Sequence, residues 1–382
     1  MNRFNGNELK YVEEVLNSNM KSATSGTFTE RLEKAFASKF NCKYAIAHNS
    51  GTSALHTAML ALGIKAGDEV ITPALTVAMD GFAIKYVGAR PIYADVKPDT
   101  LTIDPECIEY LITDKTKAII AVHLYGNPCD MNSIMDIAKK HNICVIEDCA
   151  QSFLSKYKEK LCGSIGHISI FSFENSKHIS TGEGGISLTN SENLAVKIRK
   201  YAGIGYANLT AESGRIRSNE DVFQDPKFIR HDTIGYNFRM PELCSAVALA
   251  QLERLEDIVK NRQIIASMYR YAIRDCPYLL EQRTTPNSIN SYWAFTVKYH
   301  GDIITGKTWQ DFRKAYIRNG GDGFYGAWQL SYNEPALRDQ TSLCPTAELI
   351  QPRIMQFKTN YQDLDIAQKK ADALEKTIRE LS

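Results

Sequence analysis

Short apolar segments alternate with amphipathic segments along the first part of the chain. The apolar segments are four to six residues long, as in buried β-strands, whereas the apolar residues between them recur every three or four positions, as in helices. The predicted strands cover residues 44–47, 69–72, 91–95, 118–123 and 143–148, and the predicted helices cover residues 7–19, 29–40, 54–62, 78–86, 105–111 and 131–140. This alternation predicts an α/β fold with a mostly parallel central sheet covered by helices on both faces.

The pattern changes beyond residue 190. A helix over residues 191–204 precedes a polar segment, residues 205–232, which is longer than ordinary loops and which we expect to form a flap near a site. One long helix over residues 241–274 follows and is predicted to link two domains. The last part combines a strand, a Gly-rich turn and a helix, over residues 292–297, 319–323 and 364–381. We therefore expect a large α/β domain over residues 1–248, and a linking helix with a small α+β domain over residues 249–382.

Composition and charge exclude several classes of protein. The chain has 382 residues, with 45 basic and 44 acidic side chains, so no net field favours nucleic acid or a membrane surface. No apolar run of about 18 residues occurs, and the first residues lack the apolar stretch of a signal peptide. The nine cysteines are scattered without a Cys-x-x-Cys pair, which favours reduced thiols over disulfides or zinc. We expect a cytoplasmic globular protein.

The stretch from Phe171 to Thr189 reads as two strands joined by a loop that carries Lys177. A hydroxyl, Ser172, precedes the lysine by five residues, and a cluster of glycines (182, 184 and 185) follows it. Glycines let backbone approach closely, and a lysine that is partly desolvated loses its proton more easily and can attack a carbonyl group. The alternative is an ordinary lysine on a surface loop.

Polar side chains follow several of the predicted strands. Ser50–Thr52 end the first strand, Thr76 follows the second, and Asp148 and Gln151 follow the strand over residues 143–148. Because ligands bind outside the carboxyl ends of parallel strands, these groups and Lys177 are expected to converge on one rim. Residues 50–52 open a helix and predict an anion site, although Ser50 and Thr52 could simply cap that helix.

Asp148 has three possible roles. It could cap a helix or bind a metal, but Glu147 and Asp148 lack a second group of acids or histidines nearby in the sequence, so we predict no metal. A buried acid is also suited to hold a protonated pyridine nitrogen. Together with the amine of Lys177, it supplies the two groups that pyridoxal 5'-phosphate (PLP) chemistry requires.

Five motifs, in this order, resemble the DegT/StrS group of PLP-dependent sugar aminotransferases. They begin at Asn49, Val122, Glu147, Ser172 and Gly235, and read NSGTSAL, VHLYG, EDCAQ, SF followed by Lys177 and GEGG, and GYNFRM. The resemblance covers about two thirds of the chain. It implies the fold-type I aminotransferase architecture and a PLP cofactor.

The resemblance also implies roles for individual residues. Lys177 corresponds to the lysine that binds PLP as a Schiff base and moves the proton, and Asp148 to the partner of the pyridinium nitrogen. Gln151 corresponds to a residue near the ring and its phenolic oxygen. The remaining predicted cofactor contacts are Ser50, Gly51, Thr52, Thr76, Val77 and Ser172, and Asn237 is expected to reach the phosphate from a neighbouring subunit. The resemblance therefore also implies a homodimer in which each active site is built from residues of both subunits.

A dehydratase branch of the family carries histidine instead of the lysine, and here His178 lies next to the critical position. Counting from Ser172 forward and from Gly182 backward places Lys177 at that position, which favours transamination. Val77 stands where the family commonly has an aromatic residue that stacks on the cofactor. The region over residues 320–360 lacks a Leu-Pro pattern common in enzymes of nucleotide-linked 4-keto sugars.

The predicted reaction is transfer of an amino group from L-glutamate to a keto-sugar, most simply a nucleotide-linked 4-keto-6-deoxyhexose used in surface polysaccharide or a glycosylated metabolite. Three alternatives stay open at this point. They are an aminotransferase for a sugar without a nucleotide (of the 8-amino-octulosonate type), a PLP-dependent sugar dehydratase, and a non-catalytic PLP-binding regulator.

Overall fold

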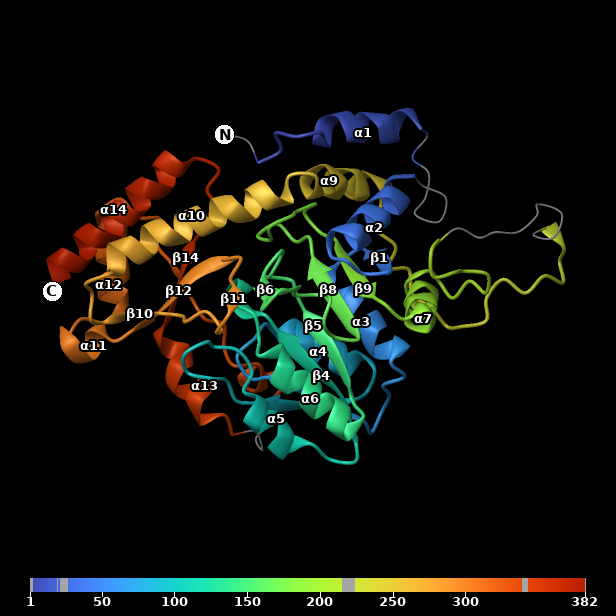
Figure 1. Ribbon diagram of the computed structural model, residues 1–382, viewed down its shortest axis with the longest axis horizontal. Coiled ribbons are helices and arrows are strands. Elements are labelled where there is room, and N and C mark those ends of the chain that lie inside the picture. The colour runs from blue at the N-terminus through green and yellow to red at the C-terminus, as the bar shows by residue number, and fades with distance from the viewer. Residues whose placement is uncertain (1–2, 19, 21–26, 215–223, 339–342, 382) are drawn as a thin grey trace.

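A seven-stranded sheet forms the centre of the large domain in the computed structural model, which describes residues 3–18, 20, 27–214, 224–338 and 343–381 (Figure 1). The strand order is β1-β9-β8-β5-β4-β2-β3. The strands are β1 (Tyr44–His48), β2 (Glu69–Pro73), β3 (Arg90–Ala94), β4 (Thr116–Val122), β5 (Cys144–Asp148), β8 (Ile168–Ser172) and β9 (Gly185–Thr189). Strands β3, β2, β4, β5 and β8 pair in parallel, and β9 is antiparallel to both β8 and β1. The predicted mostly parallel sheet is confirmed.

Helices cover both faces of this sheet. They are α1 (Glu8–Asn17), α2 (Thr27–Lys39), α3 (Gly51–Ala61), α4 (Ala78–Tyr86), α5 (Pro105–Leu111), α6 (Met131–His141) and α7 (Glu192–Ala202). Successive strand residues point to opposite faces, so Ile119 packs into one core with α2 and α6, and Ile120 packs into the other with α3 and α7. This burial on two faces explains why the strands read as continuous apolar runs.

A second, antiparallel sheet organises the small domain. Its order is β10-β12-β14-β13, and its strands are β10 (Leu279–Glu281), β12 (Ala294–Tyr299), β14 (Ile354–Lys358) and β13 (Tyr325–Gly326). Helices α10 (Leu255–Ile273), α11 (Gly301–Ile304), α12 (Trp309–Arg318), α13 (Pro345–Ile350) and α14 (Leu364–Leu381) complete this part. Helices α10 and α14 lie side by side in Figure 1, and aromatic side chains such as Phe295, Phe312 and Phe357 fill the core below them.

The expected single helix over residues 241–274 is wrong in one respect, because it is two helices. Helix α9 (Glu242–Leu252) ends and α10 begins after a turn at Glu253 and Arg254. Side chains at the turn contact distant parts of the chain. Gln251 hydrogen-bonds the backbone of Ser180, and Arg254 bonds the carboxylate of Glu8. These long-range contacts turn the chain where the sequence contains neither Pro nor Gly.

The C-terminal half also contributes to the large domain. Leu330, Tyr332 and Ala347 pack into the core on the α3 face of the large sheet, and the Asp95 carboxylate accepts the backbone N–H groups of Thr346 and Ala347 at 2.8 Å each. The small-domain core begins along α10, at Ile265. Our division of the chain at residues 248 and 249 stays a prediction.

Several smaller features complete the description. A three-stranded sheet joins β6 (Lys156–Tyr157), β7 (Lys160–Leu161) and β11 (Ser288–Ile289), and short 3-10 turns are η1 (Leu124–Gly126), η2 (Ser331–Asn333) and η3 (Gln351–Arg353). All nine cysteines are free, as predicted. Among the described residues, no helix combines the length and apolar character needed to cross a membrane. The middle of the expected flap, residues 215–223, lies outside the described residues.

Candidate active site

Lys177 lies on the loop between two antiparallel strands, β8 and β9. The loop is closed at its base by backbone hydrogen bonds from Phe173 N–H to the carbonyl oxygen of Gly184 (2.8 Å) and from Thr181 N–H to that of Phe173 (2.9 Å). Lys177 is half-buried. Burial lowers the pKa of its amine, and the carboxylate of Asp148 acts in the opposite direction. The structure therefore brings the two predicted catalytic groups within electrostatic reach of each other.

Asp148 ends β5 and is 4% exposed. One of its oxygens accepts the backbone N–H of Ala150 at 2.8 Å. Burial raises the pKa of Asp148, and a second acid, Asp80 of α4, lies within hydrogen-bond reach.

Asp80 is fully buried and was missed by the sequence reasoning. Its Oδ2 accepts the hydroxyl of Thr76 at 2.7 Å, whereas its Oδ1 has no hydrogen-bond donor. Burial and the neighbouring Asp148 raise the pKa of Asp80 well above its ordinary value. Two buried carboxyl groups this close to each other are expected to share one proton. The charged form of Asp148 is stabilised by a backbone N–H, whereas Asp80 Oδ1 has no donor, so we place that proton on Asp80. The four-residue spacing of Thr76 and Asp80 along a helix start was the available signal.

The N-terminus of α3 meets the end of β8 very closely. A Cβ atom at Gly51 would lie 2.8 Å from Cβ of Ser172, and one at Gly185 would lie 2.6 Å from the backbone of Ser50. The hydroxyl of Ser50 caps the helix by accepting the N–H of Ser53 at 3.0 Å. The alternative role that we considered for Ser50, as a helix cap, is therefore confirmed. The first N–H groups of a helix have no partner within it, and this applies to Gly51 and Thr52 at the helix end that lies against Ser172. This cradle fits a phosphate group.

Gln151 and Val77 are also placed on this rim. The side-chain oxygen of Gln151 accepts the backbone N–H of Tyr125 at 2.7 Å, which orients its amide nitrogen away from Tyr125. Tyr125 itself has an unusual backbone, with φ of 62°. Val77 is the N-cap residue of α4 and offers an aliphatic surface.

Trp293 supplies an aromatic ring that the sequence did not identify as part of the site. The amine of Lys177 lies 5.1 Å from its ring centroid, and its indole N–H donates to the carbonyl oxygen of Ser176 at 3.0 Å. Tyr125 stacks on Trp293 with ring centroids 6.2 Å apart, and Trp328 lies tilted to Trp293 at 6.0 Å. These three rings come from distant parts of the chain, so no local signal reveals them.

Asn237 does not join this group within one chain. Its side-chain oxygen accepts from the Arg239 guanidinium at 3.0 Å, and its backbone bridges Gly203. Exposed apolar side chains surround this segment, among them Ile234, which is 92% exposed, and Tyr236, which stacks on Phe238 at 4.9 Å.

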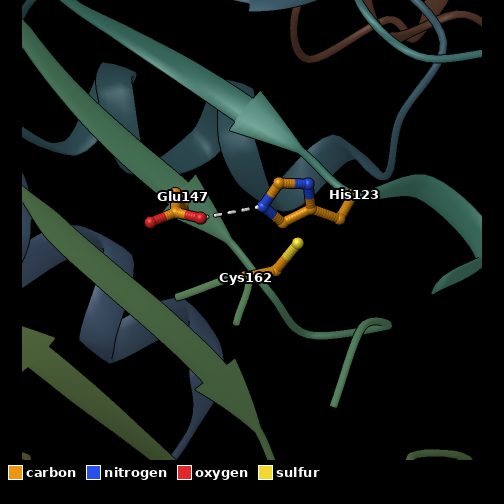
Figure 2. Close-up of side chains that lie close together, drawn as sticks. All are labelled: His123, Glu147 and Cys162. Atoms are coloured by element: carbon orange, nitrogen blue, oxygen red, sulfur yellow. Dashed lines mark hydrogen bonds and ion pairs between the residues drawn. The ribbon is translucent and has the colours of Figure 1, made fainter. Parts of the chain in front are cut away.

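A buried cluster beside β5 consists of His123, Glu147 and Cys162 (Figure 2). Glu147 has no second group of acids or histidines nearby in the sequence, yet pairing of β4 with β5 brings His123 to 3.1 Å from the Glu147 carboxylate. His123 Nδ1 accepts the backbone N–H of Cys129, so the proton is on Nε2 and is donated to Glu147.

The Glu147 carboxylate is already saturated with donors. It accepts the N–H groups of Gly163, Ile165 and Gly166 at 2.6 to 2.8 Å in addition to His123. Burial works against the charge, but these bonds hold the pKa of Glu147 below its usual value. The cluster is thus suited to hold the turn over residues 163–166 in place. The absence of a bound metal remains a prediction.

A partly desolvated lysine, a buried acid and a helix N-terminus that fits a phosphate lie together near the carboxyl ends of strands in a seven-stranded mixed sheet, an arrangement that fits a PLP-dependent enzyme of fold type I. The model of the DegT/DnrJ/EryC1/StrS aminotransferase family matches residues 2–367, and the chain belongs to this family. It is a PLP-dependent aminotransferase, which confirms the predicted family, fold, cofactor and enzyme class.

Three known proteins illustrate the similarity. GDP-perosamine synthase of Escherichia coli O157:H7 is 41% identical over 292 residues, which is 76% of this chain and 75% of that protein. An aminotransferase from Psychrobacter cryohalolentis has a solved structure with a TM-score of 0.87 at 30% identity, covering 98% of this chain and 97% of that one. E. coli GDP-4-keto-6-deoxy-D-mannose-3-dehydratase, solved with bound hydrated PLP, has a TM-score of 0.86 at 26% identity, covering 99% and 98%.

Proposed function

We propose that the enzyme transfers the amino group of L-glutamate to the keto group of a GDP-linked 4-keto-6-deoxyhexose. Relatives named GDP-perosamine synthase, from three organisms and 35 to 41% identical, support the nucleotide and the sugar. The observation that carries the reaction type is the amine of Lys177, which is partly desolvated and lies near a buried acid. We place the enzyme in the cytoplasm, which the free cysteines favour.

We propose a role for each site residue, supported by its contacts within the chain. We assign the phosphate of PLP to Ser172 and the N–H groups of Gly51 and Thr52, and the pyridine nitrogen to Asp148. Gln151 would present its amide N–H groups, because its oxygen is occupied by the Tyr125 backbone. When bound, PLP withdraws electrons from the carbon that carries the amine.

Lys177 is the group that moves the proton in this scheme. Burial lowers the pKa of the Lys177 amine, and the charge of Arg262 acts in the same direction, so the amine gives up its proton more readily than a free lysine. The ring of Trp293 shields the amine from water on one side and fixes its direction.

The dehydratase alternative receives no support from His178. Its Nε2 donates to the carbonyl oxygen of Ser291 at 3.1 Å, and its ring lies 5.4 Å from that of Phe153, so the Nε2 atom and one ring face of His178 are already occupied. Burial lowers its pKa well below the usual value, which keeps the ring neutral.

We also propose a homodimer in which Asn237 completes the neighbouring site. Asn237 is exposed and makes no contact with the cradle in its own chain, and it stands in an exposed apolar surface that includes Ile234 and Tyr236. Such a surface is typical of an interface.

The test of the reaction uses L-glutamate labelled with nitrogen-15 and the GDP-linked 4-keto-6-deoxyhexose, with mass spectrometry of the sugar product. Nitrogen-15 in the product is the expected result. A product that has lost a hydroxyl group and gained no nitrogen would establish the dehydratase instead. UDP-linked, dTDP-linked and nucleotide-free keto-sugars, assayed in parallel, test the proposed nucleotide separately.

A further inference from the structure

Two arginines hold the loop that carries Lys177. The Arg262 guanidinium donates to the carbonyl oxygens of Ser176 and Lys177 at 3.4 and 3.2 Å, and Arg3 donates to those of Asn175, Lys177 and His178 at 2.5, 2.5 and 3.3 Å. Arg262 further bonds the carbonyl oxygen of Trp293 and the hydroxyl of Thr359. All of these acceptors are neutral carbonyl or hydroxyl oxygens, so these hydrogen bonds do not neutralise the positive charge of either guanidinium group.

Within the part of the chain that the structure describes, these arginines have no directly bound counter-ion. Arg262 is 4% exposed, and no carboxylate among the described residues forms an ion pair with it or with Arg3. Burial and the nearby charge of Arg3 lower the pKa of Arg262 to about 9, and Glu174 acts on Arg3 only at longer range. Two like charges held inside a protein are stabilised by an anion placed between them.

A cavity of about 280 Å³ opens beside these two guanidinium groups. Its wall is formed by the N-terminal segment, the first turns of α10 and residues 359–362. Arg254 is a third cation of the wall and is paired with Glu8, and the carboxylate of Asp257 is exposed to solvent. The excess of charge in the wall is therefore positive.

His178 adds a second, independent sign of a ligand. It lines the same cavity, is 1% exposed, and has no hydrogen-bond partner at Nδ1. Because Nε2 donates to the carbonyl oxygen of Ser291, Nδ1 is an acceptor that needs a donor. A ligand suited to this wall thus has negatively charged oxygens for the arginines and one hydroxyl for His178.

We propose that this cavity binds a phosphate group that keeps one hydroxyl, as inorganic hydrogen phosphate does. Its charged oxygens meet Arg3 and Arg262, and its hydroxyl donates to His178 Nδ1. Because both arginines hold carbonyl oxygens of residues 175–178, the bound phosphate stabilises the loop that positions Lys177. The cavity is distinct from the cradle at Ser172, which receives the phosphate of PLP.

The test measures phosphate binding to the holoenzyme, in which PLP already fills the cradle. Isothermal titration calorimetry with inorganic phosphate, in chloride buffer of constant ionic strength, should show a saturable site, and the melting temperature should rise with phosphate. Sulfate, which has no hydroxyl at neutral pH, should bind more weakly. No saturable binding, or a rise in melting temperature equal to that in chloride, would overturn the proposal.

A variant that keeps both arginines makes the test specific. Gln362→Glu places a carboxylate in the cavity wall without changing the size of the side chain, and it should weaken phosphate binding by at least about tenfold through like-charge repulsion. Gln310→Glu adds the same charge at an exposed position of α12 and should bind phosphate as the wild type does. Equal affinity in both variants would contradict the assignment.

The phosphate group is either free phosphate or the terminal phosphate of a free nucleotide, because the diphosphate of a nucleotide-linked sugar keeps no hydroxyl. Competition with GDP in the same titration separates these sources: loss of the phosphate signal at saturating GDP assigns the cavity to the terminal phosphate of a nucleotide, and an unchanged signal assigns it to free phosphate. Either result supports recognition of phosphate by Arg3 and Arg262, and both are independent of whether the sugar assay succeeds.

Discussion

The amine of Lys177 lies 5.1 Å from the ring centroid of Trp293, and the indole N–H of the same tryptophan donates to the carbonyl oxygen of Ser176. One side chain, from the residue just before β12, thus places its ring beside the amine and bonds the backbone next to it. The small domain thereby helps to set the position and the charge state of a lysine that belongs to the large domain.

Replacing Trp293 by Leu should lower the pKa of Lys177 in the apoenzyme by about 0.4 to 1.5 units, because a cation over an aromatic face is stabilised by about 0.5–2 kcal/mol. The pH dependence of the rate at which PLP reacts with the apoenzyme measures that pKa. Trp293→Phe keeps an aromatic face, so the pKa of Lys177 in this variant should lie between its values in the wild type and in Trp293→Leu. An unchanged pKa in Trp293→Leu would show that the ring does not act on the amine.

Lys177→Ala should reduce transamination by at least about a thousandfold, because it removes the attacking amine and the proton carrier together. Borohydride reduction followed by mass spectrometry should attach PLP to the wild type and not to the variant. Lys158→Ala removes an exposed lysine and serves as the matched control. Turnover near the wild-type rate in Lys177→Ala would exclude the proposed mechanism.

Asp80→Asn should make apoenzyme stability less dependent on pH. The pKa of Asp80 is raised in the folded state, so its contribution is fully present at low pH and declines as pH rises above the ordinary value of 3.8. Asparagine cannot ionise, yet its amide can still bond Thr76 and Asp148.

The expected result is equal stability of the two proteins near pH 4 and a variant more stable by about 1–3 kcal/mol at pH 8. Urea unfolding of both apoenzymes at several pH values measures this difference. A difference that stays constant with pH would mean that Asp80 does not hold the shared proton.

Gly51→Ala should weaken PLP binding, because the new Cβ would lie 2.8 Å from that of Ser172 and would push α3 away from β8. A loss of about tenfold to a hundredfold in affinity is expected from one disturbed phosphate contact. Equilibrium dialysis of PLP measures it. Gly326→Ala is the control, since its Cβ would meet no atom closer than 4.0 Å.

A mixture of Lys177→Ala and Asn237→Ala subunits should recover activity that neither variant has alone. In a shared-site dimer each mixed pair contains one native site, so random pairing restores about a quarter of the wild-type activity. Co-expression with two different tags and native mass spectrometry would verify the mixed dimers. Mixed dimers without activity would contradict the assignment of Asn237 to the neighbouring site.

Sequence patterns predicted the parts of the structure that depend on neighbouring residues. The strand and loop around Lys177 and the helix boundaries at Ala78, Pro105 and Leu364 all follow from local periodicity. The site residues that the sequence singled out on strand ends, such as Asp148 and Ser172, reach one rim because parallel strands end together.

The features that the sequence did not reveal depend on contacts between distant segments. Trp293 reaches Lys177 only through the packing of the small domain, and His123 meets Glu147 only through the pairing of two strands. The turn between α9 and α10 forms because Arg254 bonds the N-terminal segment, a cause that helix propensity does not contain.

The position of β9 has a consequence for refolding. This strand lies between β1 and β8 and pairs with both, and its first residue, Gly185, packs against the backbone at Ser50. The two halves of the phosphate cradle are therefore held together by a strand that the chain adds after both of them. Because pairing of distant segments is slow, recovery of PLP binding should trail recovery of helical circular dichroism, and the cofactor thereby becomes a reporter of the last stage of assembly.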